Sequence, residues 1–160
     1  DTDVFSEVDL NVVVDDALSI LSKKIEEENS TINVSKLPQI KAIKPQLVSV
    51  FQNLLDNSLK YRAKRMLKVS ISTTEGTNDF TIRYKDNSIG IDPKFADQVF
   101  TIFKRLHPRD GDKGTGIGLA LVKRVVNRHR GDIWLESDGR NGTTFYLTFP
   151  KAVTTENTLV

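Results

Sequence analysis

Apolar residues recur at helical spacing in three long segments of the chain. The first follows Asp9 and Asn11, either of which can cap a helix, and it ends in the polar run 26–29. The second opens at Lys44-Pro45, where the missing N–H of proline costs little, and the third runs from Gly118 to about Arg130. The stripes of the first two read Val14, Ala17, Leu18, Leu21 and Ile25, and then Val48, Phe51, Leu55 and Ser58. We therefore expect three amphipathic helices.

Shorter segments between these helices predict strands. The clearest pair, 68–74 and 80–85, alternates apolar with polar residues around Glu75-Gly76-Thr77-Asn78 and predicts an antiparallel hairpin. Further strands are expected at 31–34, 40–43, 133–136 and 143–149, and a short helix from Asp92-Pro93 through Val99. Helices on one face of a mixed, mostly antiparallel sheet make an α+β two-layer sandwich, which is the fold we expect.

Composition and charge narrow the class of protein. The 160 residues, 38% hydrophobic and 28% charged, suit one domain at 1–150 followed by a pattern-free, disordered tail at 151–160. A net charge of +2 without long basic blocks argues against a nucleic-acid partner. The chain has no cysteine, which excludes disulfides and cysteine-bound zinc and fits a reducing compartment.

Hydropathy and the first residues bear on location. No apolar run reaches the roughly 18 residues that a membrane-spanning helix needs, so we expect no direct membrane contact and a cytoplasmic location. The chain begins Asp1-Thr2-Asp3 without methionine. We therefore expect an excised piece of a longer parent, which could itself be membrane-anchored.

The most informative motif is a glycine-spaced loop, 114–118, that runs directly into the third predicted helix. Glycines let backbone N–H groups approach an anion, and the start of a helix adds its positive dipole end, so this junction suits a phosphate. Two motifs precede it: Asn53-Leu54-Leu55-Asp56-Asn57-Ser58-Leu59-Lys60-Tyr61 and Asp86-Asn87-Ser88-Ile89-Gly90-Ile91. Between the second motif and the loop lie Phe95, Phe100 and Phe103.

This order of motifs closely resembles the ATP-binding catalytic domain of sensor histidine kinases, with its N box, first glycine box, phenylalanine box and second glycine box. The resemblance extends from about Phe5 to Pro150, and 103–107 is similar to the variant of phytochrome-like and PAS-linked kinases. It implies the Bergerat-type ATP-binding fold of the gyrase, chaperone, histidine kinase and MutL superfamily. ATP and Mg²⁺ are the implied cofactors.

The resemblance also assigns roles to single residues. Asn57 becomes the magnesium ligand, and an amide oxygen suits a cation that keeps several waters. Asp86 becomes the acceptor for the exocyclic amine of adenine, a role that a guanine carbonyl would not satisfy. The implied catalytic residues are Asn53, Lys60 and Arg105. The implied nucleotide contacts are Asn57, Lys60, Tyr61, Asp86, Gly90, Ile91, Lys113, Gly114, Thr115, Gly116, Ile117, Gly118, Leu119 and Thr143, with Thr144 as an alternative to the last.

Asn53 separates a kinase from a hydrolase. In related gyrase-type ATPases this position is a glutamate that activates water, whereas an amide cannot take that proton. Hydrolysis is therefore disfavoured, and the resemblance implies donation of the γ-phosphoryl group to a histidine. The segment 104–113 predicts a mobile ATP lid, in which Lys104, Arg105, Arg109 and Lys113 are candidates to neutralise the γ-phosphate.

The chain departs from the family pattern at two positions. Ser88 stands where the family has the first glycine of its first glycine box, and it would be strained if the backbone φ were positive and harmless otherwise. Arg130 precedes Gly131 where many relatives have paired glycines, and we expect it to matter only for the exit from the helix.

A phosphoacceptor histidine is not identified in this sequence. Neither His107 nor His129 has the acid and downstream proline of such a site, and we expect both at the surface or in the lid. The acceptor would belong to the dimerisation domain of the same parent, with a response regulator as an indirect partner and the isolated domain a monomer. Two alternatives are a degenerate nucleotide-binding or partner-docking module without kinase activity, and a gyrase-type hydrolase.

Overall fold

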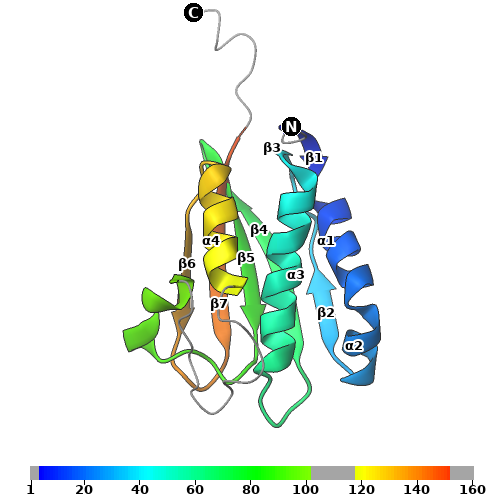
Figure 1. The fold of residues 1–160 in the computed structure, drawn as a ribbon, viewed down its shortest axis with the longest axis vertical. Coiled ribbons are helices and arrows are strands. Elements are labelled where there is room, and N and C mark those ends of the chain that lie inside the picture. Colours follow the sequence, from blue (N-terminus) through cyan, green and yellow to red (C-terminus); the bar gives the residue numbers. More distant parts are fainter. Residues whose placement is uncertain (1–3, 102–117, 152–160) are drawn as a thin grey trace, which may run out of the picture.

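The computed structural model describes residues 4–101 and 118–151, and in these ranges helices are followed by pairs of consecutive strands along the chain (Figure 1). The strands are β1 (Ser6–Asp9), β2 (Thr31–Val34), β3 (Gln39–Ala42), β4 (Lys68–Glu75), β5 (Asp79–Asp86), β6 (Ile133–Ser137) and β7 (Thr143–Pro150). The helices are α1 (Leu10–Ile20), α2 (Ser22–Glu27), α3 (Lys44–Lys60) and α4 (Gly118–Arg128), with two 3₁₀ turns, η1 (Pro93–Phe95) and η2 (Gln98–Phe100).

Five of the strands form one sheet in the order β2-β4-β5-β7-β6. β2 and β4 run parallel, and the other neighbouring pairs are antiparallel. Figure 1 shows α1, α3 and α4 side by side over one face of this sheet. The predicted α+β two-layer sandwich, with a mixed and mostly antiparallel sheet, is confirmed.

Alternation along the central strands decides which side chains face the helices. In β5, Ile82 and Tyr84 are buried while Arg83 and Lys85 are exposed. Because successive side chains of a strand point to opposite faces, Asp86 at the end of β5 lies on the same side as Tyr84. The side of α3 that packs on this layer is apolar except for one residue, and its buried members are Leu47, Val50, Phe51, Leu54, Leu55, Ser58 and Leu59.

The predicted hairpin is confirmed as β4 and β5, paired from Val69–Asp86 to Glu75–Phe80. Strand β1, in contrast, carries no pattern that would predict it. It has four residues, of which only Val8 is buried, and it pairs antiparallel with β3 in a separate two-stranded sheet. Its pairing is set by the partner strand, since the alternation in 6–9 is too short to indicate a strand.

Two predicted helices differ in detail from the structure. The first helix is divided at Leu21 into α1 and α2, although the Ile25 N–H still donates to the Leu21 carbonyl at 2.9 Å. Its N-cap is Asp9, whose carboxylate accepts from the Asn11 N–H at 2.8 Å. The segment after Asp92-Pro93 forms η1 and η2 and not one α-helix, because runs this short are satisfied by i to i+3 bonds, such as Phe95 N–H to Asp92 oxygen at 2.8 Å.

The expectation that His129 lies at the surface or in the lid is wrong. His129 is buried just beyond α4, between the rings of Phe5 and Phe149, whose centroids lie 5.0 and 6.4 Å from its own. The Ile43 N–H donates to Nε2 at 3.0 Å, so Nδ1 carries the proton and donates to the Val125 carbonyl at 2.8 Å. The imidazole thereby pairs with the Ile43 N–H at the start of α3 and adds a second hydrogen bond to the Val125 carbonyl, which also accepts from the His129 backbone N–H at 3.1 Å.

This placement predicts that stability falls on mild acidification. Burial lowers the pKa of His129, which the Val125 carbonyl opposes and the charge of Arg128 reinforces. The unfolded chain, with an ordinary histidine pKa of about 6.5, then binds the extra proton first, so the contribution is complete above that pH and is lost as the pH falls through the lower folded-state pKa. Urea unfolding at about pH 7.5 and about pH 5.5 measures the difference.

The matched variants for this measurement are His129→Gln and His107→Gln. Glutamine keeps one donor and one acceptor but does not titrate, so the part of the pH dependence due to this histidine should disappear in His129→Gln alone. A pH dependence that survives unchanged in His129→Gln would contradict the assignment.

Within the described part of the chain, none of the helices combines the length and apolar character needed to cross a bilayer.

Candidate functional site

Helix α3 places the two asparagines of the first motif one turn apart on its face toward α4. The Asn53 amide donates to the Ser49 carbonyl at 2.7 Å, which leaves its oxygen directed away from the helix backbone. That oxygen lies 3.1 Å from the position that a Cβ on Gly118, the first residue of α4, would occupy. The end of the glycine loop therefore meets the N box, and glycine permits this close approach.

Asn57 lies one turn further along α3 and is half-buried. Its side chain has no hydrogen-bond partner among residues 4–101 and 118–151, while its backbone oxygen accepts from the Tyr61 N–H at 3.1 Å. Its amide oxygen is thus available to an incoming group.

Lys60 and Tyr61 mark the end of α3. The Lys60 ammonium lies 5.9 Å from the centroid of the Tyr61 ring, and Lys60 also lines a cavity of about 690 Å³ with Lys24 and Glu28. The Tyr61 carbonyl accepts from the Ile89 N–H at 3.0 Å. This bond fastens the first glycine box to the end of the N box.

Asp86 is the polar side chain of the site with the most hydrogen bonds. Its side chain is buried, with 4% of the residue exposed, and its Oδ1 accepts from the Ser88 N–H at 3.1 Å, the Ser88 hydroxyl at 2.8 Å and the Thr143 N–H at 3.0 Å. Its Oδ2 accepts from the Ser58 hydroxyl at 2.5 Å. A buried carboxylate is tolerated here because protein donors satisfy it.

Ser88 is not strained, since its backbone φ is not among the positive values, and the harmless alternative holds at this position. Gly90, which the chain retains, does need its glycine. Its φ is 84°, and a Cβ there would lie 2.9 Å from both the Arg140 nitrogen and the Ser137 oxygen. The next residue, Ile91, donates its N–H to the Ser137 hydroxyl at 2.8 Å, which holds the box against the end of β6.

The turn between β6 and β7 brings Thr143 to Asp86. Asp138 accepts from the N–H groups of Arg140 and Asn141, both at 2.8 Å, and these bonds lower its pKa to about 2. Thr143 is buried and faces the helices, whereas Thr144 lies on the other face of the sheet. Of the two threonines, Thr143 is therefore the one beside Asp86. Arg130, with a φ of 62°, lies at the exit from α4, as expected.

Several predicted site residues lie outside the described ranges. They are Arg105, Lys113, Gly114, Thr115, Gly116 and Ile117, together with the predicted lid. Of the glycine loop and its continuation, the structure describes Gly118 and the buried Leu119, which begin α4.

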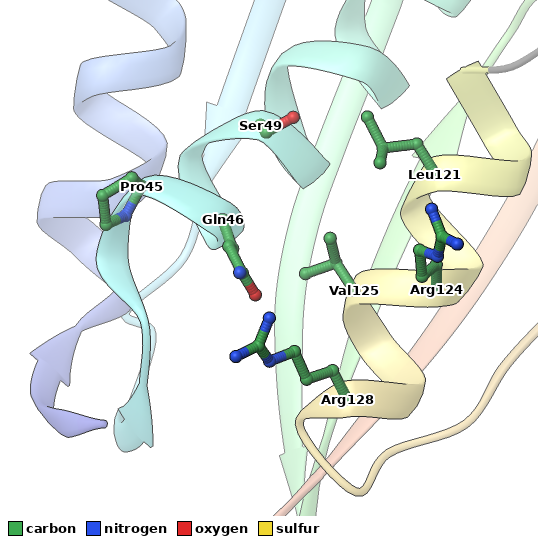
Figure 2. A pocket seen from close by; sticks show the side chains of 7 residues that line it. All are labelled: Pro45, Gln46, Ser49, Leu121, Arg124, Val125 and Arg128. Atoms are coloured by element: carbon green, nitrogen blue, oxygen red, sulfur yellow. The ribbon is translucent and has the colours of Figure 1, made fainter. Parts of the chain in front are cut away.

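A separate groove of about 410 Å³ lies between the first turns of α3 and the side of α4 that faces them (Figure 2). Figure 2 shows the Arg128 guanidinium reaching from α4 toward Gln46 on α3. Ser49, which lines this groove, also holds Asn53, so the groove borders the candidate site without containing any of the predicted nucleotide contacts.

Comparison with known proteins bears directly on this geometry. Residues 42–153 match the family described as histidine kinase-, DNA gyrase B- and HSP90-like ATPases, and this span includes Asn53, Asn57, Asp86, Gly118 and Thr143. The chain belongs to this family. It is an ATP-binding catalytic domain of the histidine kinase type.

Curated relatives agree with this assignment. The phytochrome-like protein Cph1 of Synechocystis sp. is 43% identical over 142 residues, which are 89% of this chain and 19% of that protein. Cyanobacterial phytochrome A of Nostoc sp. is 40% identical over 146 residues, which are 91% of this chain and 19% of that protein. The chain thus spans about a fifth of the length of these relatives.

Solved structures support the fold of the histidine kinase catalytic domain. The nucleotide-free catalytic domain of histidine kinase ThkA matches with a TM-score of 0.77 at 22% identity, covering 92% of this chain and 97% of that one. The mycobacterial sensor histidine kinase MprB matches with a TM-score of 0.79 at 24% identity, covering 94% and 100%.

Three residues that hold Asp86 or the first glycine box have no role that the sequence of this kinase-type domain predicts. Ser58 was noted only as a member of the apolar stripe of α3, and Tyr84 and Ser137 were not singled out. A hydroxyl in an otherwise apolar buried stripe is itself a signal, because a buried polar group requires a partner. The signal does not say which partner, since Asp86 is 28 residues away along the chain.

Proposed function

We propose that this domain binds Mg-ATP and donates the γ-phosphoryl group to a histidine on the dimerisation domain of its parent protein. The observation that carries the proposal is the convergence of three motifs on α3. Gly118 lies against Asn53, Ser58 bonds Asp86 and Ile89 bonds Tyr61, so the N box, first glycine box and start of α4 form one site.

At the base end of this site, the Asp86 carboxylate accepts a hydrogen bond from the exocyclic amine of adenine. A carboxylate offers only acceptors, so it pairs with an amine and not with the carbonyl oxygen of guanine. Gly90, Ile91 and Thr143 border the same end, and the Thr143 N–H already donates to Asp86. The base is thereby selected by chemistry that the phosphates do not supply.

At the phosphate end, Asn57 holds Mg²⁺ through its amide oxygen. The donor set fits this cation, because Mg²⁺ takes one or two protein oxygens and completes its shell with waters and phosphate oxygens. Among the described residues, no cluster of three or more His, Cys, Asp or Glu side chains offers a metal site built from the protein alone. Bound there, Mg²⁺ would offset the charge of the triphosphate.

Asn53 favours transfer over hydrolysis. Its amide nitrogen is committed to Ser49 and its oxygen is too weak a base to deprotonate water. Lys60 and Tyr61 contact the phosphates or the ribose from the end of α3. The glycine loop 113–117 and Arg105 complete the phosphate contacts and charge neutralisation in this proposal.

The proposed partners follow from this chemistry. The histidine belongs to a dimerisation domain of the same parent, and a response regulator receives the phosphoryl group afterwards. A cytoplasmic location suits a domain that uses ATP.

Phosphotransfer in trans tests the proposal. We expect the 160-residue chain, mixed with a dimerisation hairpin that carries a phosphoacceptor histidine, to form acid-labile phosphohistidine from radiolabelled ATP only when Mg²⁺ is added. Asn57→Ala should reduce the rate and the Mg-ATP affinity about ten- to a hundredfold, the range typical of lost metal support. Asn127→Ala, an exposed asparagine on α4, is the matched control and should change neither.

Two outcomes would overturn it. Nucleotide binding without any transfer to the hairpin would indicate a partner-docking module. Rapid steady release of inorganic phosphate by the chain alone would indicate a hydrolase, in spite of Asn53.

A further inference from the structure

Two consecutive hydrogen bonds link the side chains of Tyr84, Ser58 and Asp86, and they end on the Asp86 carboxylate. The Tyr84 hydroxyl lies 2.8 Å from the Ser58 hydroxyl, and the Ser58 hydroxyl lies 2.5 Å from Asp86 Oδ2. All three groups are buried, with Tyr84 0%, Ser58 1% and Asp86 4% exposed. These hydrogen bonds run from strand β5 to helix α3 and back to the end of the same strand.

The direction of the two hydrogen bonds follows from the groups themselves. A carboxylate only accepts, so Ser58 donates its single proton to Asp86 and must accept from Tyr84. Tyr84 keeps its proton, because burial and then the charge of Asp86 raise its pKa well above its usual range. One arrangement therefore satisfies every atom: Tyr84 donates to Ser58, and Ser58 donates to Asp86.

The two carboxylate oxygens are held in different ways. Oδ1 has three donors, two of which are the backbone N–H groups of Ser88 and Thr143. Among the residues that the structure describes, Oδ2 has one donor, the Ser58 hydroxyl. Since a carboxylate oxygen has two lone-pair sites, Oδ1 is saturated and Oδ2 retains one free acceptor position.

We propose that Ser58, backed by Tyr84, is a positioning residue for base recognition that fixes Asp86 Oδ2 as the acceptor for the exocyclic amine of the purine. The inference rests on the proposed function, in which Asp86 recognises adenine. Without Ser58, the carboxylate is held on the Oδ1 side alone and can turn about that side, so the free acceptor position is no longer aimed at one place. Ser58 would then affect the contribution of the amine and not the binding of the rest of the nucleotide.

The difference between Ser58 and Ser88 sharpens the proposal. Both serines donate a hydroxyl to Asp86, but removal of the Ser88 hydroxyl leaves Oδ1 with two backbone donors. Removal of the Ser58 hydroxyl leaves Oδ2 with none. A larger loss of base discrimination is therefore expected in Ser58→Ala than in Ser88→Ala.

The test compares two nucleotides on the same chain by calorimetry with Mg²⁺ present. One is ATP and the other is purine riboside triphosphate, which lacks the exocyclic amine, and the readout is the ratio of the two dissociation constants. We expect a ratio of roughly ten to a hundred for the unmodified chain, the usual value of a hydrogen bond to a charged group. The ratio should fall at least threefold in Ser58→Ala. It should also fall in Tyr84→Phe, which removes the hydroxyl that donates to Ser58.

Controls distinguish positioning from a general structural role. The exposed Ser70→Ala should leave the ratio within about twofold of the unmodified chain, and Ser88→Ala should lower it less than Ser58→Ala does. A variant that weakens both nucleotides equally has only lost structure, and that result for Ser58→Ala would overturn the proposal. Tyr84→Phe gives a second, independent measurement from a different element if Ser58→Ala is destabilised.

Failure of this inference and failure of the proposed function give different results. A ratio near one for the unmodified chain would show that Asp86 does not read the amine, and both would fall. A high ratio that is unchanged or raised in Ser58→Ala would overturn the role of Ser58 alone and leave the proposed function intact.

Discussion

Asp86→Asn is expected to weaken ATP binding about a hundredfold. Three donors converge on Oδ1 and one on Oδ2, and the proposed adenine amine is a further donor. An asparagine has one acceptor oxygen and one NH₂ group, so its NH₂ must face donors whichever way the amide is turned. A buried donor left unsatisfied costs about 1–3 kcal/mol, and the upper end of this range corresponds to about two orders of magnitude in affinity.

Calorimetric titration of Mg-ATP measures this loss, and Asp56→Asn is the matched control. This variant removes the same charge from α3, where, in the described part of the chain, Asp56 pairs with the half-exposed Lys24 at 3.3 Å. Its replacement should alter the affinity less than about twofold, since exposed ion pairs contribute little. An Asp86→Asn affinity within threefold of the unmodified chain would contradict the role given to this carboxylate.

Gly142→Ala is expected to destabilise the fold by about 4 kcal/mol, a large part of the roughly 5–15 kcal/mol that holds a domain of this size together. The backbone φ of Gly142 is 100°, and a Cβ at this position would collide with the backbone oxygen of Asp86 and lie 2.9 Å from the Asn87 Cα. Neither backbone atom can move aside without breaking the pairing of Asp86 with Thr143. Urea unfolding followed by circular dichroism measures the change.

Gly139→Ala separates strain from collision. Gly139 also has a positive φ, 83°, but the nearest atom to an added Cβ is 3.4 Å away, which is ordinary contact. Its substitution should therefore cost only the strain of a left-handed alanine, about 1–2 kcal/mol. Equal losses in the two variants would mean that the contact with Asp86 is not what makes Gly142 necessary.

The sequence was sufficient for the larger part of the fold. Patterns of the right period and clear turn residues mark the hairpin β4–β5, helix α3, which opens at Lys44-Pro45, and strand β7, which ends at Pro150. The structure confirms all of them. Local sequence signals are weaker where tertiary contacts determine the secondary structure. Strand β1 forms because it pairs with β3. The single helix predicted after Asp9 is divided into α1 and α2 at Leu21, although no glycine or proline stands there.

The candidate site divides in the same way. Asn53, Asn57 and Asp86 belong to motifs whose residues are adjacent in the chain, so the resemblance of these motifs to the histidine kinase pattern assigns them from the sequence. Ser58 reaches Asp86 across 28 residues through a side-chain contact that no spacing encodes, and Tyr84 is linked to Asp86 only through that Ser58 hydroxyl. His129 was misplaced for a related reason, since its partners Ile43 and Phe5 come from the other end of the chain.

The four protein donors around Asp86 also bear on the thermodynamics of recognition. A carboxylate already held in one orientation loses little conformational freedom when a ligand arrives, so the entropic cost of ordering falls elsewhere. In the described part of the chain, the Asn57 side chain has no hydrogen-bond partner, and the Lys60 side chain is long. Both therefore have more conformational freedom to lose. In the proposed complex, the base end of the site is thus preorganised, and the phosphate end loses the greater conformational freedom on binding.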